Sequence, residues 1–222
     1  MCGRYTLTKP EDTVKKNLQV EIAGSLQPLY NACPTMMLPI ICSEYKQTVN
    51  FFRWGLVPFW AKDLSIGPKL INARSETLTE KPAFRAAFRY RRCLVLADGY
   101  YEWQARDNSK VPYRITLKDE PLLTFAGLWE AWHSSDGGTL YSFCIITTAA
   151  APAIAHLHDR MPALLQTPEQ RNLWLSDINN TKPLIPLLQP YTATPIHFYP
   201  VTKAVNKAGF NSPELIQPLP IL

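Results

Sequence analysis

The sequence predicts an α+β fold, with a single domain over residues 1–222 built on a largely antiparallel β-sheet or barrel and with helices at its periphery. Short apolar runs separated by polar turns dominate the chain, and this pattern is typical of strands joined in hairpins. Helical patterns occur only between those runs. The 222 residues are 46% hydrophobic, which is enough to bury a core.

The first half of the chain is expected to alternate strands with two helices. Arg4–Leu7 has the pattern of a short first strand. A helix is expected to run from Pro10 to about Ile22, because proline suits a first turn and Glu11 and Asp12 suit the positive end of the helix dipole. The segments expected next are a loop over Tyr30–Pro34, strands over Met36–Ser43 and Thr48–Gly55, an aromatic loop over Val57–Gly67, a strand end or turn over Leu70–Thr77, and a helix over Lys81–Phe88.

Strands dominate the second half of the chain. We expect them over Cys93–Ala97, Pro112–Lys118, Leu122–Trp129, Leu140–Thr148 and His197–Val201. Thr167 and Gln170 have the spacing of a capping box, which predicts a helix over Glu169–Leu175. The most apolar stretch, Leu140 to Leu157, contains polar residues and a proline. We interpret it as a buried strand followed by a short helix, not as a membrane span.

Composition narrows the class of protein. With 18% charged residues and a formal net charge of +5, the chain allows a basic patch for nucleic acid, although solubility alone would explain the same excess. The 5 cysteines are widely spaced and no Cys-x-x-Cys occurs, which argues against a disulfide scaffold or a zinc site and for a reducing compartment. No signal-peptide pattern begins the chain. We therefore expect a cytoplasmic or nucleoid-associated monomer without metal, cofactor or membrane partner.

The first four residues, Met1-Cys2-Gly3-Arg4, carry the most specific chemistry. Aminopeptidases remove Met1 when the next residue is small, and the product would carry the α-amine and the thiol of Cys2 on adjacent carbons. An aldehyde condenses with such an amine to an imine, and the thiol then closes a stable thiazolidine ring. A lowered pKa of either group, with the cation of Arg4 nearby, would supply the nucleophile. The alternative is a processed terminus without a role.

Glu102 is the first candidate for proton transfer. It stands between Tyr101 and Trp103 at the end of an apolar run, where partial desolvation would raise the pKa of its carboxyl. The alternative is a half-exposed strand glutamate whose aromatic neighbours face the core.

The second candidate lies in the segment His156-Leu157-His158-Asp159-Arg160. His158 is closer to the charged residues than His156 and is the better acid–base candidate. The two histidines could also ligate a metal, but no further ligand cluster accompanies them. Asp159 and Arg160 could form an ordinary surface pair.

Asn72 and Arg74 would share one face of an extended segment. An amide could orient a reacting group there, and an arginine could bind a phosphate. The alternatives are a capping asparagine and an ordinary salt-bridged arginine. Phe59 and Trp60 could stack on bases, as in single-strand binding proteins, whereas Trp54 fits core packing at least as well.

Six motifs occur in order along the first three quarters of the chain. They are Met1-Cys2-Gly3-Arg4, Asn31…Pro34, Trp54-Gly55, Ile71-Asn72-Ala73-Arg74-Ser75-Glu76-Thr77, Ala97-Asp98-Gly99-Tyr100-Tyr101-Glu102-Trp103 and His158-Asp159-Arg160-Met161-Pro162. In this order they closely resemble the SRAP family, the SOS-response-associated peptidases. Ala204-Val205-Asn206 and Glu214-Leu215-Ile216 are also similar to that family.

The resemblance implies a protein of the DNA damage response that binds single-stranded DNA and joins Cys2 covalently to abasic sites through a thiazolidine. Cys2 matches the crosslinking cysteine, Glu102 the proton-shuttling acid, and His158 the residue that assists ring opening and crosslink reversal. Asn72 matches the asparagine that holds the N-terminal cysteine. The DNA-binding residues implied by the match are Arg4, Asn31, Pro34, Phe59, Trp60, Arg74 and Arg160. The peptidase label of the family reflects removal of the residue before the cysteine.

Two other functions stay open at this point. A class II glutamine amidotransferase also matures to an N-terminal Cys-Gly, but the similarity is confined to Met1-Cys2-Gly3, and glutaminase activity would decide for it. A non-catalytic single-strand binding protein would have an incidental Cys2. One departure from the SRAP pattern is Cys33, at a position where the family usually carries a small apolar residue, and its thiol could oxidise with that of Cys2 if the two lie close together.

Overall fold

Two β-sheets form the framework of the described residues. A computed structural model describes residues 2–106 and 109–220. The first sheet contains β2 (Glu21–Ile22), β4 (Met37–Cys42), β5 (Thr48–Trp54), β6 (Asn72–Arg74), β7 (Arg92–Ala97), β10 (Leu123–His133), β11 (Thr139–Ala149) and β12 (Arg160–Pro162). The second contains β1 (Tyr5–Leu7), β3 (Leu29–Ala32), β8 (Gly99–Arg106), β9 (Ser109–Leu117) and β13 (Ile196–Pro200).

The first sheet closes on itself. Its strands follow the order β12-β11-β10-β7-β4-β5-β2, β6 pairs with β11, and an additional pairing of β11 with β5 completes a barrel of five strands. Most neighbours are antiparallel, but β11 runs parallel to both β5 and β6, and β2 runs parallel to β5. Closure removes the exposed edges of β5 and β11 as templates for further pairing. The expected antiparallel sheet or barrel is therefore confirmed, with a few parallel pairs.

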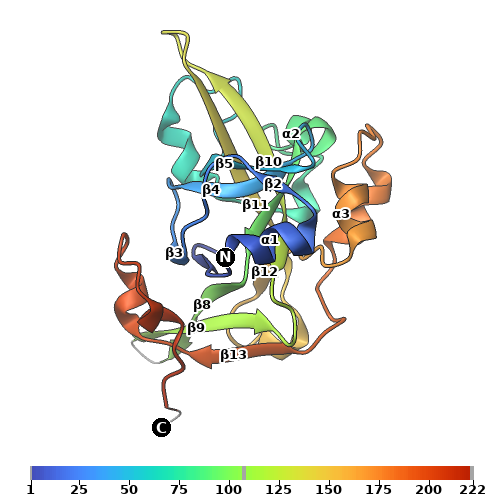
Figure 1. The fold of residues 1–222 in the computed structure, drawn as a ribbon. Coiled ribbons are helices and arrows are strands. Elements are labelled where there is room, and N and C mark those ends of the chain that lie inside the picture. Colours follow the sequence, from blue (N-terminus) through green and yellow to red (C-terminus); the bar gives the residue numbers. More distant parts are fainter. Residues whose placement is uncertain (1, 107–108, 221–222) are drawn as a thin grey trace.

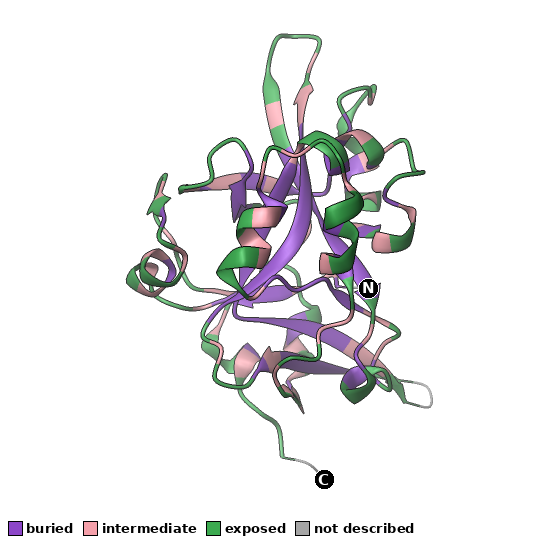
Figure 2. Cartoon of the chain, turned by 90° about the vertical axis from the view of Figure 1, so that its right-hand side faces the viewer, coloured by how far each residue is buried: buried purple, intermediate pink, exposed green. Residues whose placement is uncertain are grey.

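Among the described residues, three α-helices lie at the periphery: α1 (Glu11–Leu18), α2 (Arg85–Tyr90) and α3 (Pro168–Trp174). Figure 1 shows them on the outside of the strands, and Figure 2 shows that the strands carry most of the buried residues. The predicted capping box is present. The Thr167 side chain accepts from the backbone N–H of Gln170, and the Gln170 side chain accepts from the backbone N–H of Thr167. In the part of the chain that the structure describes, no helix is long and apolar enough to cross a membrane.

Trp54 lies where the barrel closes. Its side chain is fully buried, and its ring lies 6.3 Å from that of Phe143, which belongs to the partner strand, with an interplanar angle of 8°. The indole Nε1 donates to the carbonyl of Ile71 at 3.0 Å. The core-packing interpretation of Trp54 is therefore confirmed.

Two predicted helices have the wrong bounds. The helix expected to reach Ile22 ends at Leu18, because Gln19 adopts a left-handed conformation with φ of 55° and the chain then pairs with β5 as β2. The helix expected from Lys81 begins only at Arg85, since a proline follows Lys81 and biases that residue away from helical geometry. Lys81 instead begins a turn, and its carbonyl accepts from the backbone N–H of Arg85 at 3.0 Å.

The loop expected over Tyr30–Pro34 is also partly wrong. Its first residues form the end of β3, which pairs antiparallel with β1, so that Tyr5 lies opposite Ala32. This pairing is a contact between distant residues, and the local turn signals of Asn31 and Pro34 did not indicate it. It places β1, and with it the N-terminus, between β3 and β8 in the second sheet.

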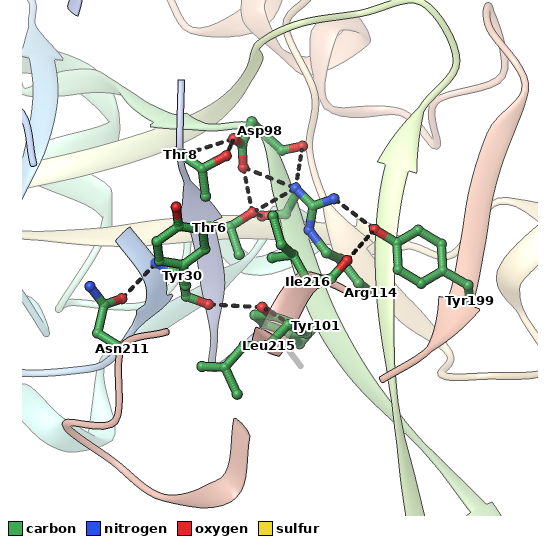
Figure 3. A network of polar contacts seen from close by, with 11 residues as sticks. Thr6, Thr8, Tyr30, Asp98, Tyr101, Arg114, Tyr199, Asn211, Leu215 and Ile216 are labelled. Carbon is green, nitrogen blue, oxygen red and sulfur yellow. Dashed lines mark hydrogen bonds and ion pairs between the residues drawn. The ribbon is translucent and has the colours of Figure 1, made fainter. Parts of the chain in front are cut away.

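A buried polar network holds the corner where the chain leaves the barrel for the second sheet. Asp98 lies between β7 and β8 and accepts from the backbone N–H of Thr8 at 2.7 Å, from the hydroxyl of Thr6, and from Arg114 Nη2 at 3.1 Å. Arg114 also donates to the hydroxyl of Tyr199 at 2.9 Å, as Figure 3 shows. The network thus joins β1, β8, β9 and β13. A Cβ at Gly99 would lie 3.0 Å from the guanidinium of Arg114, so a side chain there would require the guanidinium to shift.

Asp98→Ala is expected to destabilise the protein by about 3–5 kcal/mol, because it leaves Arg114 buried without its carboxylate partner. The Asp98 side chain is 1% exposed, so water does not replace the lost contacts. Urea unfolding followed by fluorescence measures the change. Asp177→Ala is the matched control: its side chain is 87% exposed, and loss of its ion pair with Lys46 should cost no more than about 1 kcal/mol. Equal midpoints for wild type and Asp98→Ala would contradict this account.

Candidate active site at the N-terminus

Four segments distant in sequence carry the predicted catalytic residues. Cys2 precedes β1, Asn72 begins β6, Glu102 lies within β8, and His158 lies just before β12. Figure 1 shows the N-terminus between the barrel and the second sheet. Met1, whose removal the sequence predicts, lies outside the described residues.

Asn72 holds the backbone of Cys2. The Cys2 residue is fully buried, and its carbonyl accepts a hydrogen bond of 2.8 Å from Asn72 Nδ2. The parallel pairing of β6 with β11, with Asn72 opposite Ile145, fixes the position of that amide. The second polar atom of the amide, Oδ1, is buried and has no hydrogen-bond partner among the described residues. Asn72 therefore presents an acceptor next to the N-terminal cysteine.

Glu102 is buried, not half-exposed. It is 2% exposed and lies opposite Tyr113 in the pairing of β8 with β9. Its strand, β8, begins directly after Asp98. Burial raises the pKa of its carboxyl to about 7, and the nearby carboxylate of Asp159 adds to this increase. The carboxyl of Glu102 can therefore both accept and release a proton near neutral pH.

The thiol of Cys2 has a raised pKa. Burial raises its pKa well above the usual range, and the negative charge of Glu102 raises it further. The thiol donates a weak hydrogen bond to the carbonyl of Arg4 at 3.7 Å. The sequence left open whether the thiol or the α-amine has a lowered pKa, and enclosure of the cysteine in the core gives the thiol a raised one. Such a thiol needs a neighbouring base to become a nucleophile.

His158 is held by its own segment. Its Nδ1 lies 2.9 Å from Asp159 Oδ1, and the backbone N–H of Arg160 donates to the same nitrogen at 2.9 Å. Burial lowers the pKa of the imidazole. The alternative of an Asp159–Arg160 surface pair is wrong, because Asp159 faces His158 and Arg160 forms a two-pronged contact with Glu76, at 2.6 and 2.8 Å.

A pocket of about 640 Å³ opens beside Asn72. Trp60 and Arg74 line it together with Lys81 and Phe84. Phe59 and Trp60 are 58% and 49% exposed, which is unusual for such large apolar side chains. Lys81 was assigned only to a helix from the sequence. Its position seven residues after Arg74, next to a proline, is the signal that could have indicated a loop cation at the site.

The other predicted DNA-binding residues have varied surroundings. Arg4 donates to the carbonyl of Asn206 at 3.5 Å, and the half-buried Pro34 follows β3. The side chain of Asn31 is buried, and its Nδ2 donates to the backbone of the C-terminal segment at Val205, Lys207 and Phe210. A DNA contact by the amide nitrogen of Asn31 would compete with these bonds, so the structure gives Asn31 an anchoring role that the sequence did not predict.

The family model described as SOS response associated peptidase (SRAP) matches residues 1–208. The chain belongs to the SRAP family. Among curated relatives, it is 43% identical to the abasic site processing protein YoqW of Bacillus subtilis (strain 168), with 98% of this chain and 99% of the relative covered. It is 33% identical to the abasic site processing protein HMCES of Xenopus tropicalis, with 96% of this chain and 77% of the relative covered.

A solved structure has the same fold as this SRAP protein. The X-ray structure of a protein from Bacteroides thetaiotaomicron superimposes with a TM-score of 0.87 at 28% identity, and the match covers 98% of this chain and 100% of that one. The SRAP match extends over nearly the whole chain, whereas the amidotransferase similarity was confined to its first three residues. Both curated relatives named above carry the description abasic site processing protein.

Proposed function

We propose that this SRAP protein binds single-stranded DNA and, once Met1 has been removed, joins Cys2 covalently to the aldehyde of an abasic site. The supporting observation is the arrangement around Cys2: its backbone is held by Asn72, and its thiol lies close enough to Glu102 for that carboxylate to raise its pKa. The carboxyl of Glu102 titrates near neutral pH. A 1,2-aminothiol beside such an acid–base group is suited to react with an aldehyde. An intact nucleotide offers it no aldehyde to react with.

The reaction proceeds in two bond-forming steps. The α-amine of Cys2 attacks C1′ of the open-chain sugar, and the resulting carbinolamine loses its hydroxyl as water to leave an imine. The thiol then adds to the same carbon, so that a C–S bond forms and the thiol proton ends on the ring nitrogen. One water leaves, and no electrons are exchanged with another reactant.

Each polar group has a role in this sequence. As a carboxylate, Glu102 accepts a proton from the attacking amine, and as an acid it protonates the departing hydroxyl. His158 exchanges a proton with the ring oxygen of the closed sugar, both when the ring opens and when it closes again during release. The buried Oδ1 of Asn72 accepts from a sugar hydroxyl.

Intact mass spectrometry tests the proposal. The purified protein should lack Met1, and after incubation with an abasic single-stranded oligonucleotide its mass should increase by that of the oligonucleotide minus one water. An intact oligonucleotide should give no adduct. A protein with an irremovable N-terminal extension should bind the same DNA without adduct, since it lacks the α-amine of Cys2. An adduct of full yield in the extended protein would rule out the thiazolidine.

Arg74→Ala should weaken the salt dependence of DNA binding. Arg74 is exposed at the rim of the pocket beside Asn72, where it can neutralise a phosphate. For single strands the slope of log K against log salt is about −0.7 per phosphate contacted, so the slope of the variant should be less steep by about 0.7. Fluorescence anisotropy across a salt series measures it. Lys15→Ala, which removes a cation paired with Glu11 on α1, is the control and should leave the slope as in wild type; an unchanged slope in Arg74→Ala would exclude Arg74 from the interface.

His158→Ala should slow release of the adduct at least as strongly as its formation, because the same imidazole serves ring opening and ring closure. Transfer of preformed adduct to excess competitor DNA measures release, and single-turnover formation is followed alongside. His133→Ala, an exposed histidine at the end of β10, is the control. Release at the wild-type rate from His158→Ala would assign this residue a structural role instead.

A further inference from the structure

A second pocket, of about 440 Å³, lies at the second sheet and shares no lining residue with the pocket beside Asn72. Side chains of β8, β9 and β13 line it together with the His156 segment and the C-terminal residues. Gln104, Arg106, Tyr113, His156, Phe198 and Leu219 are the lining residues that bear on its chemistry. Its size lies within the range of small-molecule sites, about 300–1,000 Å³.

Two chain segments lead from the candidate active site to this pocket. Side chains alternate along a strand, so Glu102, Gln104 and Arg106 share one face of β8, and Gln104 follows Glu102 at about 7 Å. Gln104 Nε2 also reaches the carbonyl of His156 at 3.5 Å, two residues before His158. The strand that positions the proposed acid–base carboxyl and the segment that positions the histidine therefore both run directly into the pocket.

Aromatic rings form one part of the pocket wall. Phe198 is 36% exposed, and its ring centroid lies 5.2 Å from that of His156 and 6.2 Å from that of Tyr113, both at inclined angles. The backbone N–H of Leu219 donates to the carbonyl of Pro200 at 2.8 Å, so the C-terminal segment follows β13 and forms another side. These rings leave one apolar surface open toward the pocket.

The polar part of the wall is fixed in orientation. Arg106 Nε donates to Gln104 Oε1 at 2.8 Å, and Arg106 Nη2 donates to the hydroxyl of Tyr113 at 2.9 Å, which holds the planar guanidinium in place. None of the described residues that line the pocket is acidic. An open aromatic surface beside a fixed guanidinium and an amide matches the way proteins bind unpaired nucleobases, by stacking on the ring and by hydrogen bonds to its edge.

We propose that this pocket receives the nucleobase of a nucleotide next to the abasic residue. The proposal rests on the proposed function, since it places the abasic sugar at Cys2. An abasic residue has no base of its own, so a strand can be held in register only through its backbone and its neighbouring bases. A base bound between Phe198 and Arg106 would hold the strand in register, so that the neighbouring abasic sugar lies near Glu102.

Binding of oligonucleotides with a tetrahydrofuran abasic analogue tests the pocket without requiring the covalent step. Three single strands of equal length are compared: one with bases on both sides of the analogue, one that also lacks the 5′ neighbouring base, and one that also lacks the 3′ neighbouring base. For wild type, removal of the base on one of the two sides should weaken binding by about 5- to 160-fold, the range for loss of one stacked base. Removal on the other side should have a smaller effect.

Phe198→Ala should abolish this difference, so that the variant binds the strands with and without that base equally. Arg106→Gln, at an exposed position, should reduce the difference and serves where Phe198→Ala fails to fold. Tyr45→Ala removes an aromatic side chain that is 58% exposed in the turn between β4 and β5, and it should retain the full difference. Equal binding of all three strands by wild type, or an undiminished difference in Phe198→Ala and Arg106→Gln, would overturn the pocket.

The two proposals fail in different ways. If the protein forms an adduct with a true abasic site but shows no dependence on the neighbouring bases, the pocket is wrong and the thiazolidine stands. If binding depends on a neighbouring base through Phe198 but no adduct forms, the base pocket stands and the covalent proposal fails.

Discussion

Cys2→Ala is expected to form no denaturation-resistant adduct with abasic single-stranded DNA. The variant keeps the α-amine, but its imine cannot close to a ring and hydrolyses on denaturation. Non-covalent binding should persist, because the hydrogen bond from Asn72 reaches the backbone carbonyl of residue 2 and not its side chain. Denaturing gels and intact mass measure the adduct, and anisotropy measures binding.

Cys93→Ala is the matched control for Cys2→Ala. Cys93 is equally buried, on β7 within the barrel, and its thiol pKa is likewise raised by burial. Its loss should cost some stability but leave the adduct at full yield. Cys2→Ser should give at most an imine that borohydride can trap, because a hydroxyl is the poorer nucleophile. A stable adduct of wild-type yield in Cys2→Ala would remove Cys2 from the chemistry.

Glu102→Gln is expected to slow adduct formation by about 10²–10⁴-fold, the range for loss of a general acid–base group. The amide retains the size of the carboxyl and can still form hydrogen bonds in the buried site, but it exchanges no proton with the amine or with the departing hydroxyl. Single-turnover formation, followed by quenching into denaturant, measures the rate. Aldehyde chemistry in solution sets the residual rate.

The pH dependence identifies the carboxyl. Because the pKa of Glu102 is about 7, the wild-type rate should show an inflection near pH 7 between pH 6 and pH 8, and Glu102→Gln should lack it. Glu130→Gln is the control: Glu130 is also 2% exposed with its pKa raised by burial, but it pairs with Arg91 away from Cys2. If Glu102→Gln reacts at the wild-type rate over this range, Glu102 has no catalytic role.

The same carboxyl affects stability with a definite sign. Its folded pKa of about 7 lies above the ordinary value of 4.5, so the folded state binds the proton more tightly than the unfolded state. The resulting stabilisation is complete below about pH 4.5 and is lost as the pH rises through 7. Glu102→Gln removes this dependence, which urea unfolding at pH 5 and pH 8 can detect alongside the kinetics.

The sequence indicated those parts of the fold that local pattern determines. Thr167 and Gln170 gave the start of α3, and the apolar run from Leu140 gave β11, because capping and strand alternation depend on nearby residues only. Barrel closure was not predictable in this way. The parallel pairing of Phe143 with Trp54 joins residues far apart in sequence, and no local signal specifies a partner strand.

In the candidate site too, local motifs indicated the residues, whereas their burial and distant contacts could not be predicted. The motifs around Cys2, Asn72, Glu102 and His158 indicated which residues to consider, and the fold places Asn72 against the Cys2 backbone. The raised pKa of the thiol could not be predicted, because burial is a property of the packed chain and four residues at a terminus do not show it. The DNA contact of Asn31 stays a prediction, whereas its anchoring role could not be predicted because its three backbone partners belong to the distant C-terminal segment.

The raised thiol pKa of Cys2 has a consequence for the lifetime of the protein as a reagent. Peroxides attack thiolates, and a thiol that stays protonated and enclosed forms sulfenic acid slowly. Oxidants also generate abasic sites, so under the proposed function Cys2 has to survive the conditions under which the proposed substrate arises. We expect this enclosure to slow oxidation of the Cys2 sulfur in the absence of DNA, and in the proposed reaction the sulfur becomes nucleophilic only when Glu102 can take its proton.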